Sequence, residues 1–141
     1  GSVGPLLAGR ERPALAAASG GLAVVGHNWS PFLRGAGGRG VSTAMGALLP
    51  YQPAGAALLL AGLTVGRLAG ESAIGVLVAD FAMVPVLTLV GGRRGRWAAA
   101  AVAVPMVLKR LLGNARPGTP GPGVYGWRLL LDRDRLAPGP R

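Results

Sequence analysis

A short glycine-rich stretch of this chain combines residue types that bind phosphate. Residues 26–46 read GHNWSPFLRGAGGRGVSTAMG and lie between two apolar runs. Glycines bring a backbone close to a ligand because they lack a Cβ, and consecutive free N–H groups form an anion-binding concavity. Ser42 and Thr43 then open an apolar run that we expect to be helical, and a helix N-terminus attracts phosphate. The pattern predicts a phosphate site.

Two arginines strengthen this prediction. Arg39 lies in the glycine loop and Arg34 just before it, and a guanidinium can hold a phosphate through two hydrogen bonds. Gly35–Gly40 also fits the dinucleotide pattern Gly-x-Gly-x-x-Gly, but no strand precedes it and no acidic residue follows about 20 positions later. Arg39-Gly40-Val41 replaces the Gly-Lys-Ser/Thr end of a Walker loop, so neither nucleotide motif is expected.

The composition points to a membrane. The chain has 141 residues, enough for one domain, and half of them are hydrophobic while 14% are charged. The mean hydropathy is +0.44, too apolar for an ordinary soluble domain. The net charge of +10 comes from basic residues that mostly fall between apolar runs, as membrane topology requires, so no nucleic-acid partner is expected. The chain has no cysteine, which excludes disulfides and thiolate metal sites.

Apolar runs predict an all-α, polytopic transmembrane bundle of four to five short helices over residues 13–112. The runs are Pro13–Gly26, Val41–Leu49, Ala54–Gly66, Ala73–Val90 and Trp97–Leu108. The first is too short to span, so it must begin earlier, run on through Trp29 and Phe32, or end where the loop dips inward. Alternation places the glycine loop, Arg67–Ser72 and Lys109 on one side, which the positive-inside bias makes cytoplasmic. Pro50–Pro53 and the loop Gly91–Arg96 fall on the opposite side. The three arginines of Gly91–Arg96 fit the positive-inside bias poorly there.

Two further regions carry predictions. Residues 113–141 read as a Pro/Gly-rich basic tail, in which Val124–Leu136 is either a segment on an anionic membrane surface or a floppy tail. Asp80 lies in the middle of an apolar run, where a charge is costly. We expect it to face the bundle interior, protonated or hydrogen-bonded by Ser72 or Thr88, and not to be catalytic.

The central stretch resembles the second signature block of the bacterial membrane glycerol-3-phosphate acyltransferases of the PlsY type, which use acyl phosphate. The matching residues are Gly26, His27, Pro31, Phe32, Gly37, Gly38, Arg39, Gly40, Val41 and Thr43. Gly35 and Ala36 replace an aromatic and a basic residue of that block. Lys109–Gly113 is similar to the core of the family's third signature block, in which Val104 and Val107 stand here at the positions of a histidine and an asparagine. Arg67 and Ile74 also match residues of a cytoplasmic turn in the family. We expect the family's first block upstream of Gly1, in which case the chain is a fragment.

The resemblance implies transfer of a fatty acyl group from acyl phosphate to the 1-hydroxyl of glycerol 3-phosphate, giving lysophosphatidic acid in phospholipid biosynthesis. It implies no metal or organic cofactor, and a multi-pass protein of the cell membrane whose site faces the cytoplasm among membrane lipids. His27 is the expected catalytic residue, either as a hydrogen-bond donor to phosphate or as a base. The alternative is an interfacial histidine whose hydrogen bonds are made by the loop backbone. The expected substrate-binding residues are Arg34, Gly37, Gly38, Arg39, Gly40, Ser42, Thr43, Lys109 and Arg110.

Two alternatives to the enzyme are open at this point. The chain could be a non-catalytic membrane protein derived from the same family, since the third block is eroded. It could also be an unrelated small transporter or membrane scaffold, in which abundant glycine and alanine serve close helix packing in lipid. The sequence gives no oligomeric state and no acyl-chain preference.

Overall fold

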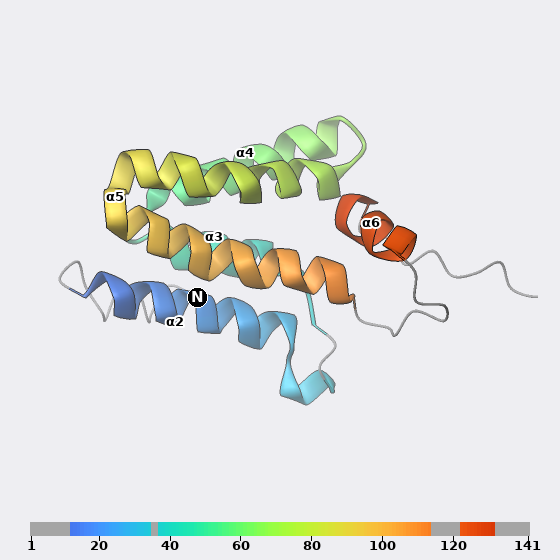
Figure 1. The fold of residues 1–141 in the computed structure, drawn as a ribbon, viewed down its shortest axis with the longest axis horizontal. Helices are drawn as coiled ribbons and strands as arrows, with labels where there is room; N and C mark the ends of the chain where they lie inside the picture. The colour runs from blue at the N-terminus through green and yellow to red at the C-terminus, as the bar shows by residue number, and fades with distance from the viewer. Residues whose placement is uncertain (1–11, 35–36, 114–121, 132–141) are drawn as a thin grey trace, which may run out of the picture.

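The computed structural model describes residues 12–34, 37–113 and 122–131, and these residues form helices only (Figure 1). The elements are α2 (Pro13–Asn28), the 3-10 helix η1 (Pro31–Leu33), α3 (Val41–Leu48), α4 (Pro53–Leu68), α5 (Ser72–Leu112) and α6 (Pro122–Leu131). The all-α prediction is therefore confirmed. The predictions made for Gly35, Ala36 and residues 114–121 and 132–141 of the tail lie outside the described residues.

Proline and glycine set the limits of several helices. α2 and α4 begin at Pro13 and Pro53, where a proline loses no helical hydrogen bond and already has the helical φ. α3 begins directly after Gly40, whose φ of 74° is left-handed. α2 ends at Asn28 and does not run on through Trp29 and Phe32. Its 16 residues stay short because the loop that follows folds back beside the helix end.

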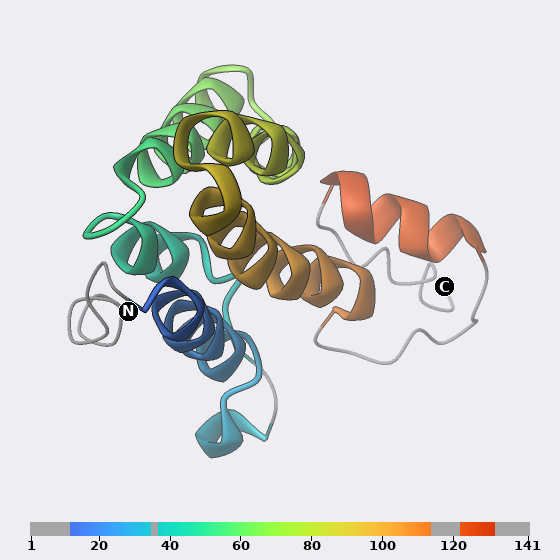
Figure 2. The ribbon, with the colours of Figure 1, turned by 60° about the vertical axis from the view of Figure 1, so that its left-hand side comes forward.

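The long helix α5 is a hairpin of two helical halves (Figures 1 and 2). The reversal takes place at Gly92, where φ is 55° and ψ is −136°. A side chain at Gly95 would collide with the backbone of Leu87, so the halves cross closely just beyond the turn. The reversal falls within the predicted loop Gly91–Arg96, but the loop itself is wrong in extent, because the run is helical apart from Gly92. One glycine makes the reversal, and Arg93, Arg94 and Arg96 stand exposed on the first turn of the second half.

The bundle is organised around these two halves. α2 packs on the second half, where Gly21 meets Ala101, and α4 packs on the first half, where Gly62 and Gly66 meet Gly75. α3 contacts α2, α4 and α5 and completes the core. Fully buried side chains from these helices form one cluster, which includes Val24, Leu48, Leu59, Met83, Leu87, Val102 and Met106. Small residues thus allow the close helix crossings, and large apolar residues fill the centre.

The helices define two ends of the bundle (Figure 1). The loop end collects the end of α2, the loop after it, the turn between α4 and α5, and the end of α5 with α6. The kink end collects the turn between α3 and α4 and the reversal at Gly92. This is the two-sided arrangement that alternating the apolar runs predicts. By length and composition, α5 is the one described helix that could cross a membrane, while α4 is apolar but shorter.

Part of the C-terminal segment is helical. Residues 122–131 form α6, which packs against α5 at the loop end. The floppy-tail alternative is therefore wrong for these ten residues. Arg128 is buried between the two helices, with 4% of its surface exposed.

Candidate functional site

The loop after α2 turns outward and then returns along the helix it has left. Pro31–Leu33 forms a 3-10 turn that ends at Arg34, a non-glycine residue with a left-handed φ of 52°. On the way back, Gly37 lies against the main-chain oxygens of His27 and Asn28, and Gly38 lies against the His27 ring. A Cβ at either glycine would collide with these groups. Gly37 and Gly38, which the sequence predicts to approach a ligand, thus pack against the end of α2.

This return path places the start of α3 inside the bundle. Gly40 is buried beside Val24 and Asn28, and its carbonyl accepts the first helical hydrogen bond from Ala44 N at 2.7 Å. The amides of residues 41–43 precede that bond and have no acceptor within α3. No side chain of the described residues caps this helix. Ser42 is exposed and Thr43 half-buried on the same first turn. The phosphate-binding role predicted for these amides stays a prediction.

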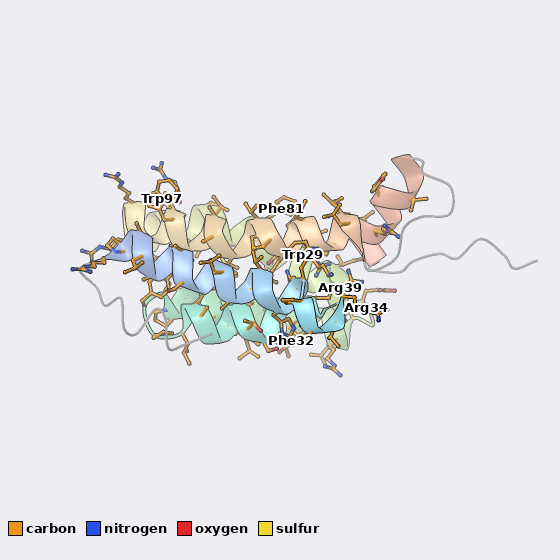
Figure 3. The ribbon with its side chains drawn as sticks, turned by 90° about the horizontal axis from the view of Figure 1, so that it is seen from below. Trp29, Phe32, Arg34, Arg39, Phe81 and Trp97 are labelled. Carbon is orange, nitrogen blue, oxygen red and sulfur yellow. The ribbon has the colours of Figure 1, made fainter. Side chains whose placement is uncertain are left out.

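Two cations from distant parts of the sequence meet beside this cradle. Lys109, in the last turn of α5, is 1% exposed, and its Nζ lies 5.2 Å from the centroid of the Trp29 ring. Arg39 is half-buried and close enough to Lys109 for the two charges to repel. Figure 3 shows Trp29 and Arg39 together at the loop end, far from Trp97 at the kink end. Two like charges held near each other favour an anion that contacts both.

Asn28 joins the two sides of this site. Its side chain is fully buried, and Nδ2 donates a 3.1 Å hydrogen bond to the carbonyl of Pro105 on α5. A Cβ at Gly40 would lie 2.7 Å from Asn28 Oδ1. Pro105 is one helical turn before Lys109, so this bond fixes the distance between the loop that carries Arg39 and the turn that carries Lys109. Among the described residues, Oδ1 itself has no hydrogen-bond donor.

The other predicted residues lie further out or point elsewhere. Arg110 is 3% exposed, but its Nη1 donates to the carbonyl of Ala73 at 2.7 Å, so it faces the first half of α5. Arg34 is exposed and lies beyond Arg39, toward the outside of the loop (Figure 3). His27 is also exposed, with its ring against Gly38. The structure therefore brings together Arg39, Lys109 and the start of α3, and places His27 and Arg34 at their rim.

Asp80 departs from its predicted environment in one respect. Its side chain is 1% exposed, which confirms that it faces the interior. The predicted hydrogen bonds from Ser72 or Thr88 are wrong, because Thr88 Oγ1 donates to its own helix at Val84 O and Ser72 is exposed. Neither carboxyl oxygen has a partner in the part of the chain that the structure describes. The charge of Arg110 acts on Asp80 through space.

The arrangement suits an anion with several oxygens. Amides at the α3 N-terminus, the Arg39 guanidinium and the Lys109 ammonium offer donors from three elements. Within residues 12–34, 37–113 and 122–131, no group of three His, Cys, Asp or Glu side chains is placed to hold a metal ion. The sequence reasoning missed Asn28, although an amide in the last turn of an apolar helix is costly to bury and thus indicates a specific partner.

Comparison with known proteins identifies a family for this chain. The sequence model of the family described as glycerol-3-phosphate acyltransferase matches residues 3–116. Glycerol-3-phosphate acyltransferase 2 of Moorella thermoacetica is 62% identical over 32 residues, which are 23% of this chain and 16% of that protein. Glycerol-3-phosphate acyltransferase of Roseobacter denitrificans is 40% identical over 78 residues, which are 55% of this chain and 39% of that protein.

The aligned stretches cover less than half of either relative, and no solved structure matches the chain. The family match nevertheless includes every element of the site described above, from the end of α2 through the last turn of α5. The resemblance found in the signature block is therefore confirmed, and the chain belongs to the glycerol-3-phosphate acyltransferase family.

Proposed function

We propose that this chain carries the phosphate-binding part of an enzyme that transfers a fatty acyl group from acyl phosphate to the sn-1 hydroxyl of glycerol 3-phosphate. The observation that carries the proposal is geometric. The contact of Lys109 with Trp29 and the bond from Asn28 to Pro105 O bring the last turn of α5 to the loop that carries Arg39 and to the start of α3. Both substrates of this reaction carry phosphate. Membership of the family supports glycerol 3-phosphate as the acceptor.

The reaction needs positioning and charge stabilisation more than a nucleophilic side chain. The hydroxyl oxygen attacks the acyl carbonyl carbon, a new ester bond forms, and the bond from that carbon to the phosphate oxygen breaks. Phosphate leaves with the electron pair, and the hydroxyl proton passes to a base. In this proposal Arg39 and Lys109 stabilise phosphate charge, the amides of residues 41–43 orient it, and His27 at the rim takes the proton.

An apolar groove of about 580 Å³ runs from this site along α2 and the second half of α5. Val25, Trp29, Val104 and Leu108 are among its lining residues, and Trp29 also carries Lys109 on its ring. One side chain thus borders both the charged site and the groove. We place the acyl chain there, in a multi-pass protein of the cell membrane whose loop end faces the cytoplasm.

The test is acyl transfer by the purified chain in lipid vesicles, with labelled glycerol 3-phosphate and acyl phosphate. We expect lysophosphatidic acid as the product, and its loss in Arg39→Ala. Arg96→Ala is the matched control, since Arg96 is an exposed arginine at the kink end. If the unmodified chain forms no lysophosphatidic acid, the transferase proposal is contradicted. If the Arg39→Ala protein is active, the role given to Arg39 is contradicted. Solute flux without acyl transfer would instead support a transporter.

A further inference from the structure

Helix α6 lies outside the part of the chain that the family accounts for. The family match ends at residue 116, and α6 begins at Pro122. The helix is nevertheless not separate from the bundle, because it packs against α5 at the loop end (Figures 1 and 2). An element beyond the family region therefore contacts the helix whose last turn carries Lys109.

Arg128 makes the polar contact between the two helices. Its side chain is 4% exposed, and Nη1 donates a 2.9 Å hydrogen bond to the carbonyl of Leu112, the last residue of α5. The final carbonyls of a helix have no partner within it and carry partial negative charge. A buried guanidinium at this position therefore both satisfies a carbonyl and complements the helix dipole.

Gly113 is shaped to admit this guanidinium. Its φ is 63°, a left-handed conformation that glycine adopts without strain, and its amide donates to Lys109 O at 2.9 Å. A Cβ at this position would lie 3.0 Å from Arg128 Cζ and 3.1 Å from Nη1. The end of α5 and the arginine of α6 are thus fitted to each other across 15 positions of sequence.

We propose that α6 is a clamp on the end of α5, and that Arg128 is a positioning residue that holds the last turn of α5, and with it Lys109, in place for phosphate. The chain of contacts runs from Arg128 to Leu112 O, from Gly113 N to Lys109 O, and from Lys109 Nζ to the Trp29 ring. The functional half of this inference rests on the proposed phosphate-binding role of Lys109.

The experiment compares the whole chain with single-residue variants in lipid vesicles. Arg128→Ala removes the clamp, Gly113→Ala obstructs it from the other side, and Leu130→Ala is a control on α6 because Leu130 is 50% exposed. Hydrogen exchange of the peptide over residues 109–113 reports the last turn directly, without any need for activity. We expect exchange there to be about tenfold faster in the first two variants only, with α2 and α4 unchanged.

Kinetics then separate positioning from general stability. We expect Arg128→Ala and Gly113→Ala to raise KM for glycerol 3-phosphate about tenfold, with kcat within about twofold of the parent. Arg128→Lys, which keeps the charge, should recover part of that loss. If hydrogen exchange over residues 109–113 is unchanged in Arg128→Ala, α6 does not clamp the end of α5. If that exchange is faster but KM is unchanged, Arg128 does not position Lys109 for phosphate. Absence of transfer by the parent chain contradicts the proposed function, while the exchange result still decides whether the clamp exists.

Discussion

The two ends of the bundle treat the same kind of residue in opposite ways. At the kink end, Arg93, Arg94 and Arg96 stand exposed on the first turn after Gly92. At the loop end, Lys109, Arg110 and Arg128 are 1%, 3% and 4% exposed. These two sets of three cations therefore differ in exposure, because only the set at the loop end is taken out of solvent.

The difference follows from what surrounds the charges. Burying a cation is costly unless nearby groups compensate it. The loop end supplies the carbonyls of Ala73 and Leu112 and the face of Trp29. The start of a helix carries partial positive charge and offers no free carbonyl, so the arginines after Gly92 point outward. The comparison teaches that the loop end is built to hold positive charge, and that basic residues at the kink end face the surroundings.

The sharpest test of this comparison exchanges one cation at each end for methionine. Lys109→Met keeps an apolar contact with Trp29 but removes the buried charge, and we expect KM for glycerol 3-phosphate to rise about 100-fold, or about 2.7 kcal/mol. Arg94→Met should change KM less than about twofold, because exposed charges contribute little. Steady-state transfer kinetics measure both. Equal effects at the two ends would break the comparison.

Two glycines of the signature block give the next largest contrast. A Cβ at Gly37 would collide with the main chain of His27 and Asn28, whereas nothing lies within 4 Å of a Cβ at Gly26. Gly37→Ala should therefore weaken glycerol 3-phosphate binding about tenfold and destabilise the fold by about 1–3 kcal/mol. Gly26→Ala, within α2, should be neutral or stabilising by up to about 1 kcal/mol. Thermal unfolding and KM together check this, and a harmless Gly37→Ala would mean that the loop does not pack as described.

Asn28 offers a smaller effect with a local control. Asn28→Ala removes the bond to Pro105 O and should lower the free energy of unfolding by about 1–3 kcal/mol, since a buried carbonyl loses its side-chain partner. Ser19→Ala removes a 3.0 Å bond to Ala16 O within the same helix and should cost less than about 0.5 kcal/mol. Denaturation of the two variants side by side gives the difference. Similar losses of unfolding free energy in the two variants would show that the bond from Asn28 to α5 stabilises the protein no more than the bond within α2.

The smallest expected effect concerns Asp80, between the two ends. Its oxygens have no hydrogen-bond partner among the described residues, so the isosteric Asp80→Asn should stabilise the protein by about 1 kcal/mol at neutral pH. The midpoint of thermal unfolding should rise, with transfer kinetics unchanged. A fall in stability would show that the carboxylate has a favourable partner, with Arg110 the first candidate.

The sequence by itself determined the helical class, the helix start at Pro13, the start of α4 to within one residue, the glycine loop before α3, and the family. These features are local, because they depend on which φ values proline and glycine allow and on short runs of apolar residues. The division into a domain over residues 13–112 and a separate tail stays a prediction, and so do the site assignments.

Only the tertiary structure decided which charges meet. Arg39 and Lys109 lie at the same end because α5 reverses at Gly92, within the run Gly91–Arg96 that the sequence predicts as a loop between two apolar segments. The bond from Asn28 to Pro105 and the clamp of Arg128 on Leu112 join residues 77 and 16 positions apart. No periodicity or motif records such contacts, because they depend on how helices pack after they have formed.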